Sequence, residues 1–149
     1  MKHATIDDFD NVYSYFTKNR KWFPHVRTDY LKRMITGGMC ILDREVVITY
    51  TIYKKRTKIN KGASVYGEKG DCILHQIVSK KGKATEVFTD FFDYINTNLF
   101  LSVRASNDTA INFYLKMGMK EVDKTTWGNG VEGLVFHKPE IVGTLEEFM

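Results

Sequence analysis

Residues 102–118 read SVRASNDTAINFYLKMG, and this stretch decides the fold of the chain. It begins as an apolar strand and then turns through Ser106, Asn107 and Asp108, whose side chains can accept hydrogen bonds from nearby backbone amides and so start a helix. The next apolar residues recur at i, i+3, i+4 and i+7, the spacing of one helix face: Ala110, Phe113, Tyr114 and Met117. Gly118 stands where a helix stops. The stretch therefore predicts a strand, a polar turn and an amphipathic helix.

The same residues carry a resemblance to a known family. Asn107, Ala110, Phe113-Tyr114 and Gly118-Met119 resemble the N-x-x-A-x-x-F-Y-x-x-x-G-F pattern of the GNAT superfamily of acyl-CoA N-acyltransferases, with Met119 in place of the usual aromatic residue. In that family the Asn lies beside the pantetheine arm of the cofactor, and the Tyr is the general acid for the departing thiolate. The resemblance implies these roles for Asn107 and Tyr114. A phenol with a pKa of about 10 suits a thiolate whose conjugate acid has a pKa of about 8.5.

Length and composition indicate a folded soluble protein. The chain has 149 residues, 43% of them hydrophobic and 27% charged, and we expect a single domain over residues 1–149. Cys40 and Cys72 lie in apolar runs without metal-like spacing, so we expect small buried side chains, no metal site, and a disulfide only in an oxidising compartment. The sequence shows no signal peptide or long apolar span, so we expect a cytoplasmic monomer or homodimer without a membrane partner.

The net charge favours an anionic partner. It is +4 at pH 7, with a pI of about 9.0. Coenzyme A, with its phosphates, and nucleic acid both satisfy this condition.

The first part of the chain predicts two helices. One is expected over residues 6–19 and the other over 28–36, where Gly37-Gly38 stops it. The aromatic and basic connection between them contains Trp22, Phe23 and His25. In GNAT folds this connection lines the acceptor pocket, so the resemblance implies that these three residues bind substrate. By composition alone they read as a helix connection that two aromatic side chains hold against the core.

Strands follow. Residues 39–42 and 45–53 predict a hairpin that turns at Asp43-Arg44. Residues 54–58 are basic and lead into a long flexible connection up to residue 70, which is either a solvated loop or a contact for a polyanionic acceptor. The apolar run 71–78 predicts a central strand covered on both faces.

A short Gly and Lys loop, residues 79–84, joins this strand to a helix expected over residues 85–97. A strand, such a loop and a helix N-terminus together bind phosphates through backbone N–H groups. The second GNAT motif has Arg or Gln in its first position, Gly in its fourth and Gly or Ala in its sixth. Residues 79–84 resemble it, with Ser79 in the first position and Gly82 and Ala84 in the other two. An alternative register from Lys81 to Glu86 keeps neither small residue of the motif. The resemblance implies acetyl-CoA as cofactor, bound by Ile77, Val78, Ser79, Lys80, Lys81, Gly82, Lys83, Ala84, Asn107 and Tyr114. P-loop spacing is absent, which disfavours a nucleotide at this loop.

A closing hairpin is expected from residues 119–126 and 131–137, turning at 127–130. The fold class is therefore α+β. The resemblance implies a mixed, mostly antiparallel sheet of about six to seven strands flanked by about four helices, with acyl-CoA entering where two central strands splay apart.

Transfer also requires a base for the amine and an N–H group for the oxyanion. The family takes the N–H from the central strand, here near Ile77 or Val78. His75 lies on this strand and titrates in a useful range, although a core histidine would look the same in sequence. Glu68, Asp71 and His25 are the alternative bases.

The leading hypothesis is a catalytic Tyr114 and His75 moving an acetyl group from acetyl-CoA to a primary amine. One alternative is an acyltransferase that acts on a nucleobase amine of DNA or RNA, because the basic run 54–58 and the aromatic segment near Trp22 suit such a substrate. Another is a non-catalytic module of the same fold that binds nucleic acid or a partner protein.

Overall fold

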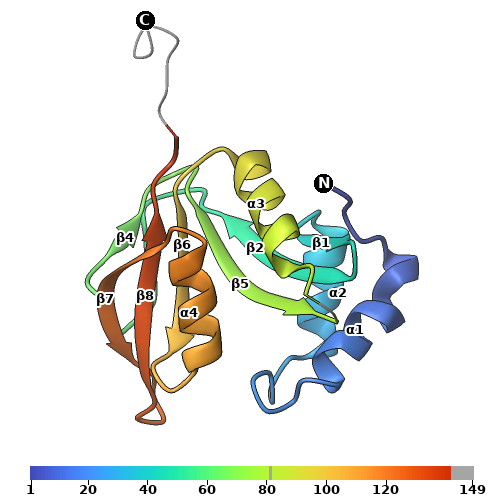
Figure 1. Cartoon of the computed structure of the whole chain (residues 1–149), viewed down its shortest axis with the longest axis horizontal. Coiled ribbons are helices and arrows are strands. Elements are labelled where there is room, and N and C mark those ends of the chain that lie inside the picture. Colours follow the sequence, from blue (N-terminus) through green and yellow to red (C-terminus); the bar gives the residue numbers. More distant parts are fainter. Residues whose placement is uncertain (81, 142–149) are drawn as a thin grey trace, which may run out of the picture. The chain divides into compact units, whose positions relative to one another are not determined.

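The computed structural model describes residues 1–80 and 82–141 (Figure 1). Its helices are the 3-10 turn η1 (Ile6–Asp8), α1 (Phe9–Thr17), α2 (Thr28–Thr36), α3 (Ala84–Ile95) and α4 (Asp108–Lys116). Its strands are β1 (Cys40–Asp43), β2 (Val46–Ile52), β3 (Thr57–Lys58), β4 (Tyr66–Gly67), β5 (Cys72–Ser79), β6 (Leu99–Arg104), β7 (Lys120–Thr126) and β8 (Glu132–Lys138).

The strands form a six-stranded sheet of order β1-β2-β5-β6-β8-β7 and a two-stranded sheet of β3 and β4. Pairing is antiparallel for β1 with β2, β6 with β8 and β7 with β8, and parallel for β5 with β6. The expected α+β class, with a mixed and mostly antiparallel sheet and four helices, is confirmed for the part of the chain that the structure describes.

The chain divides into two compact units. Unit 1 comprises Met1–Thr51 and Leu74–Tyr94, and unit 2 comprises Ile52–Ile73 and Ile95–Met149. Strand β5 belongs to both, because its first two residues lie in unit 2 and the rest in unit 1. A single domain over residues 1–149 stays a prediction.

The core of unit 1 packs α1 and α2 against strand residues. Helix α1 contributes Val12 and Phe16, and α2 contributes Leu31 and Ile35, all of them buried. The bounds of α2 agree with the expected 28–36. Helix α1 is shorter than the expected 6–19, because residues 6–8 form a tighter 3-10 turn in which the Asp8 carboxylate accepts the backbone N–H of Thr5 at 2.8 Å.

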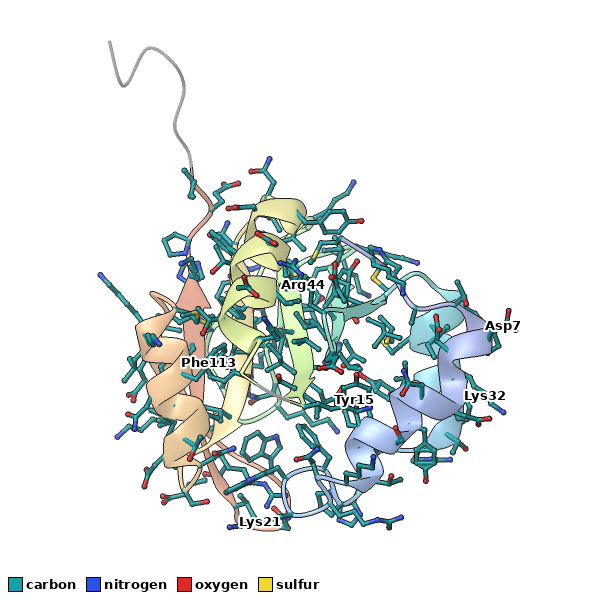
Figure 2. The ribbon with its side chains drawn as sticks, turned by 45° about the vertical axis from the view of Figure 1, so that its right-hand side comes forward. Asp7, Tyr15, Lys21, Lys32, Arg44 and Phe113 are labelled. Carbon is teal, nitrogen blue, oxygen red and sulfur yellow. The ribbon has the colours of Figure 1, made fainter. Side chains whose placement is uncertain are left out.

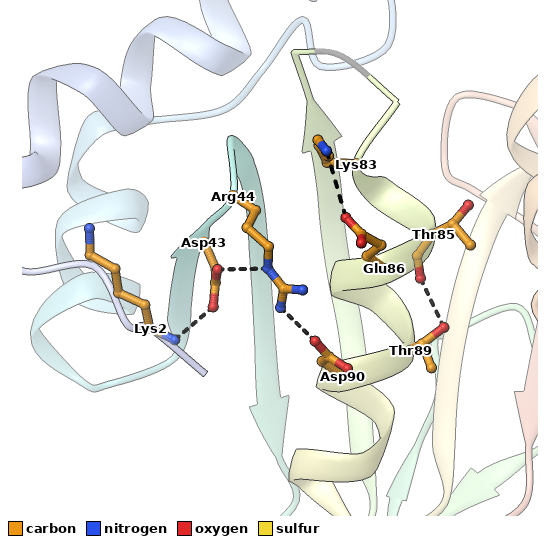
Figure 3. Close-up of polar contacts among 8 residues, drawn as sticks. All are labelled: Lys2, Asp43, Arg44, Lys83, Thr85, Glu86, Thr89 and Asp90. Atoms are coloured by element: carbon orange, nitrogen blue, oxygen red, sulfur yellow. Dashed lines mark hydrogen bonds and ion pairs between the residues drawn. The ribbon is translucent and has the colours of Figure 1, made fainter.

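The first hairpin turns one residue later than expected. Asp43 pairs with Val46 in the ladder, so the turn residues are Arg44 and Glu45, with φ of 47° and 61°. Two consecutive positive φ angles make a two-residue turn whose twist matches that of the strands. Arg44 lies between two carboxylates, at 3.0 Å from Asp43 and 2.6 Å from Asp90 of α3, which ties the turn to that helix (Figure 3).

The prediction of a long flexible connection up to residue 70, in unit 2, is wrong. Residues 57–58 and 66–67 pair as β3 and β4, and the intervening Ile59 and Ala63 are buried in a cluster with Phe100 and Val135. The Asp123 carboxylate of β7 accepts the backbone N–H groups of Ser64 at 2.6 Å and Val65 at 3.2 Å. These contacts fix one side of the segment against unit 2, and the charged side chains of the segment stay exposed.

The remaining unit 2 elements follow the sequence closely. Strand β6 leads into α4, and Gly118 ends that helix with φ of 88°. The closing hairpin turns at residues 127–130, where the Trp127 N–H donates to the Val131 carbonyl at 2.9 Å. Cys40 and Cys72 are free thiols and both are buried, as expected. Among the described residues, no helix has the length and apolar character needed to cross a membrane.

Candidate functional site

The end of β5 presents a buried hydroxyl. Among the described residues, nothing hydrogen-bonds the Ser79 Oγ, although this atom is shielded from solvent. A buried polar atom without a partner costs about 1–3 kcal/mol, so the hydroxyl of Ser79, the last residue of β5, is a candidate contact for a polar ligand. Ser79 stands at the position where the family motif has Arg or Gln.

Gly82 gives the loop its turn. Its φ is +54°, in the left-handed region that favours glycine, and a Cβ built there would meet no atom within 4 Å. Space beside the loop is therefore open. Helix α3 begins two residues later, and its first amides have no carbonyl partner within the helix. Backbone N–H groups next to open space are what a phosphate requires.

The loop lysines have neighbours of their own. The Lys80 Nζ lies 4.4 Å from the ring centroid of Tyr15, which is labelled in Figure 2, and its backbone N–H donates to the Glu45 carbonyl at 3.2 Å. The Lys83 Nζ lies 3.9 Å from the Glu86 carboxylate in the first turn of α3 (Figure 3). Both members of that pair are well exposed, so a phosphate could displace the carboxylate at little cost. Lys81 lies outside the described residues.

A polar cluster occupies β2, β5 and α2 of unit 1. The Gln76 Oε1 accepts the Tyr30 hydroxyl at 3.1 Å and also the Thr49 hydroxyl. Thr49 is fully buried, and burial raises the pKa of Tyr30, so its phenol remains a donor. Tyr30, Thr49 and Gln76 belong to no motif of the sequence. The only signal was the pair of threonines that interrupts the apolar residues of β2.

His75 lies beside this cluster. Its Nε2 is 2.8 Å from the Thr51 hydroxyl, and its ring meets that of Tyr30 edge-on, with centroids 6.3 Å apart. The residue is solvent-exposed, yet the surrounding protein atoms desolvate the imidazolium and lower the pKa of His75 below its usual 6.5. A neutral ring that solvent can reach is what a base requires.

The alternative bases are differently engaged. The buried Asp71 carboxylate accepts the Glu68 backbone N–H at 2.8 Å and the Asn98 side-chain amide at 3.2 Å, which is a structural arrangement within unit 2. Glu68 pairs with Arg56 at 3.1 Å. His25 is exposed on the connection between α1 and α2. Among the candidate bases, these contacts favour His75.

The three predicted substrate-binding residues differ in their contacts. Phe23 packs edge-on against Phe16, with ring centroids 5.3 Å apart, and so anchors the connection to the core of unit 1. Trp22 is half-buried, and the Nζ of Lys21, a residue labelled in Figure 2, lies 4.9 Å from the centroid of the Trp22 ring. The contact of Phe23 is that of a core residue, whereas Trp22 and His25 keep surface for a ligand.

Unit 2 holds the two residues of the opening stretch. The Asn107 Oδ1 accepts the Ala110 N–H at 3.1 Å, which caps α4. Tyr114 lies in the same helix and is 6% exposed, packed near Phe113 and Phe136. Burial raises the pKa of Tyr114 well above its usual value of 10. The helix thus uses Asn107 as its N-cap and directs Tyr114 to the interior.

The predicted site residues are therefore divided between the units. Unit 1 holds a larger group, comprising Trp22, Phe23, His25, His75, Ile77, Val78, Ser79, Lys80, Gly82, Lys83 and Ala84, and unit 2 holds Asn107 and Tyr114. Of the residues expected to supply the oxyanion N–H, Val78 is buried and Ile77 half-buried in β5.

No family model matches the chain, and no curated protein matches it. Solved structures do match. A GNAT-family acetyltransferase from Bacillus cereus is 17% identical, with a TM-score of 0.69, covering 94% of this chain and 96% of that one. The ribosomal-protein-S18-alanine N-acetyltransferase from Escherichia coli is 13% identical, with a TM-score of 0.69 and coverage of 97% and 95%. NAA60 from Arabidopsis thaliana, in complex with acetyl-CoA, is 16% identical, with a TM-score of 0.62 and coverage of 93% and 96%. At these identities the likeness concerns the fold.

Proposed function

We propose that this chain, which has the GNAT fold, is an acyl-CoA-dependent N-acyltransferase. It would move an acetyl group from acetyl-CoA to a primary amine. The observation that carries the proposal is the likeness in fold to acetyltransferases over at least 93% of the chain. The motif from Asn107 to Tyr114 supports it, because it keeps the residue types of the family pattern at the two positions to which the pattern gives a role.

Acetyl-CoA fits the residues at the end of β5. The Ser79 hydroxyl has no hydrogen-bond partner among the described residues, and together with the open space beside Gly82 and the first amides of α3 it suits the phosphates of the cofactor. The exposed Lys83 adds a positive charge. The cofactor would supply an acyl group already activated as a thioester.

His75 is the proposed base. Its lowered pKa keeps the ring neutral at pH 7, so it can take a proton from the ammonium form of the acceptor or from the amine as it reacts. The contact with Thr51 holds the ring in one orientation. Glu68 and Asp71 have less support, because both are engaged with other groups.

Tyr114 is the proposed acid. Burial raises its pKa, so the phenol stays protonated at neutral pH and can donate a hydrogen bond, and then its proton, to the thiolate as negative charge develops on the sulfur. The backbone N–H of Ile77 or Val78 is the proposed oxyanion donor.

The acceptor side is proposed to include Trp22 and His25, with Tyr30 and Gln76 adding polar groups in unit 1. A nucleobase amine of DNA or RNA is the alternative acceptor, and it rests on the basic run 54–58 and on the aromatic segment near Trp22. The cytoplasmic location and the monomeric or homodimeric state stay predictions.

Thermal unfolding in the presence of ligands tests the proposal. Acetyl-CoA and CoA should each raise the melting temperature, because a ligand at about a hundred times its Kd adds roughly 2.7 kcal/mol to the free energy of unfolding. ATP, which lacks pantetheine, should have a much smaller effect. A melting temperature unaffected by both CoA forms would contradict the proposal and favour a non-catalytic module.

A further inference from the structure

The excess of positive over negative residues in the chain lies in the segment 54–69, which contains β3 and β4. Of the 22 Lys and Arg residues and 18 Asp and Glu residues, 6 and 1 lie in this segment, so the other 133 residues carry 16 cations and 17 acids. All six cations are exposed: Lys54, Lys55, Arg56, Lys58, Lys61 and Lys69. The positive charge of the protein is thus local to one hairpin.

One face of this hairpin combines the cations with an aromatic ring. Lys58 pairs with Tyr66 across the two strands, and Arg56 and Glu68 extend the same face at a spacing of two residues. The Arg56 guanidinium lies 4.4 Å from the ring centroid of Tyr66, which is 41% exposed. The hairpin therefore presents a guanidinium over a tyrosine ring, with Lys58 on the same face and the other exposed lysines in the adjoining residues.

The opposite face holds the hairpin in place. Ile59 is buried, and a Cβ on Gly67 would collide with the Tyr53 ring, so the backbone lies flat on the core of unit 2. The Asn60 side-chain amide donates to the Ser102 hydroxyl of β6 at 2.8 Å, and Asp123 accepts two backbone N–H groups of the segment. A partner would bind a preformed surface and lose little conformational entropy on doing so.

We propose that this face of the β3–β4 hairpin binds single-stranded nucleic acid, with an unpaired base on the Arg56–Tyr66 stack and backbone phosphates on the surrounding lysines. Aromatic rings and guanidinium planes on a rigid strand surface are stacking platforms for unpaired bases, and lysines track phosphates. An acidic peptide would need the lysines but not the stack. In a duplex the faces of the bases are covered by neighbouring bases, so they cannot stack on Arg56 and Tyr66.

The one acid on this face does not oppose the proposal. Glu68 pairs with Arg56 at 3.1 Å, and both side chains are about two-thirds exposed, so the pair is weak and a phosphate can replace the carboxylate. The surface lies wholly within unit 2, and the basic and aromatic residues that would bind nucleic acid are not among the proposed acyltransfer site residues.

Fluorescence anisotropy with labelled oligonucleotides of about 12 nucleotides tests this surface. Single-stranded RNA and single-stranded DNA are titrated separately, which shows whether binding depends on the sugar. A duplex and polyglutamate serve as competitors. Binding should weaken as salt rises from about 50 to about 200 mM. Tyr66→Ala should weaken it roughly 5- to 150-fold, and Tyr66→Phe should leave it nearly unchanged, because stacking needs the ring and not the hydroxyl.

Variants that remove lysines distinguish binding at the hairpin from attraction of nucleic acid to the overall positive charge of the protein. Lys54→Gln with Lys55→Gln should lower the slope of log affinity against log salt by about 0.7 for each phosphate that the variant no longer neutralises. The matched control is Lys116→Gln with Lys120→Gln, which removes the same charge from exposed positions outside the hairpin and should leave the slope unchanged. Each variant is checked by its melting temperature and by its response to acetyl-CoA, which should equal that of the wild type.

Three outcomes would overturn the proposal: no oligonucleotide binding at about 50 mM salt, equal weakening by the control pair, or equal competition by polyglutamate. A Tyr66→Ala variant that keeps its melting temperature and binds as tightly as the wild type would also overturn it. None of these results tests the acyltransferase proposal, which is tested separately by the response to acetyl-CoA and by turnover.

Discussion

The Thr51 hydroxyl lies 2.8 Å from the Nε2 of His75, so a side chain of β2 fixes the orientation of a ring carried by β5. Thr51 is neutral, and no charged group is among the causes of the shifted pKa of His75, which desolvation alone lowers. The ring is therefore poised to be neutral at pH 7 because of its surroundings and not because of a paired charge.

The first prediction concerns pH. Because the pKa of His75 is lowered in the folded protein, the base is available above that pKa, and kcat/KM should fall as pH decreases through it, at a pH below 6.5. His75→Gln should lower kcat/KM roughly 100- to 10,000-fold and remove this limb of the pH profile. The measurement is CoA release with a fixed amine acceptor across the pH range.

Thr51 provides the control for this prediction. Thr51→Val removes the hydroxyl and should lower kcat/KM about 5-fold, as expected for the loss of one hydrogen bond worth about 1 kcal/mol. Thr51→Ser keeps the hydroxyl and should restore the rate. If His75→Gln kept the wild-type profile, another group would be the base.

The second prediction concerns the acid. Tyr114→Phe should lower kcat roughly 10- to 1000-fold and leave the Kd for CoA nearly unchanged, because it removes a proton donor and keeps the buried ring. Tyr94→Phe is the matched change at an exposed tyrosine and should have no effect on kcat. Stopped-flow turnover and calorimetric CoA binding give the two values. Wild-type turnover in Tyr114→Phe would exclude Tyr114 as the acid.

The third prediction concerns the loop. Gly82→Asp should weaken CoA binding at least 10-fold, because it adds a negative charge where phosphates would approach the amides of α3. Gly130→Asp is the matched control, since Gly130 also has a positive φ, of 80°, with open space around its Cβ position, but it lies in the closing hairpin. Both variants bear the same kind of backbone strain. Equal CoA affinity in the two would show that the loop does not bind the cofactor.

The fourth prediction separates two roles of Asn107. Asn107→Ala should lower the free energy of unfolding by about 1 kcal/mol, because the N-cap bond to Ala110 is removed. Asn107→Ser retains the cap and should restore stability. If Asn107 also contacts the pantetheine arm, Asn107→Ser should still bind CoA more weakly than the wild type. Wild-type affinity in this variant would limit Asn107 to capping.

Much of the fold follows from local patterns. Helix α2 has the predicted bounds because its apolar spacing and the following glycines agree, and the stretch from β6 through α4 to Gly118 follows the pattern of residues 102–118. The first turn was misplaced because Arg44 and Glu45 have no bias toward positive φ, and only the pairing of β1 with β2 selects that geometry.

The proposed site is only partly visible in the sequence. The composition of the loop between a strand and a helix points to Ser79 and Gly82, and their role in binding stays a prediction. Tyr30, Thr49 and Gln76 were missed, because their hydrogen bonds join residues that are 27 and 46 positions apart. The contact of Lys80 with the Tyr15 ring is likewise invisible in a pattern of neighbouring residues.

By itself, the sequence determined the element types, the capped helix that begins at Asn107, and the Gly and Lys loop before α3, because each depends on residues within a few positions of one another. Only the tertiary structure decided that residues 54–69 form a fixed hairpin, that Ser79 has a buried hydroxyl and that desolvation lowers the pKa of His75. Burial depends on which distant segments pack together, and hydrogen-bond satisfaction and pKa depend on burial.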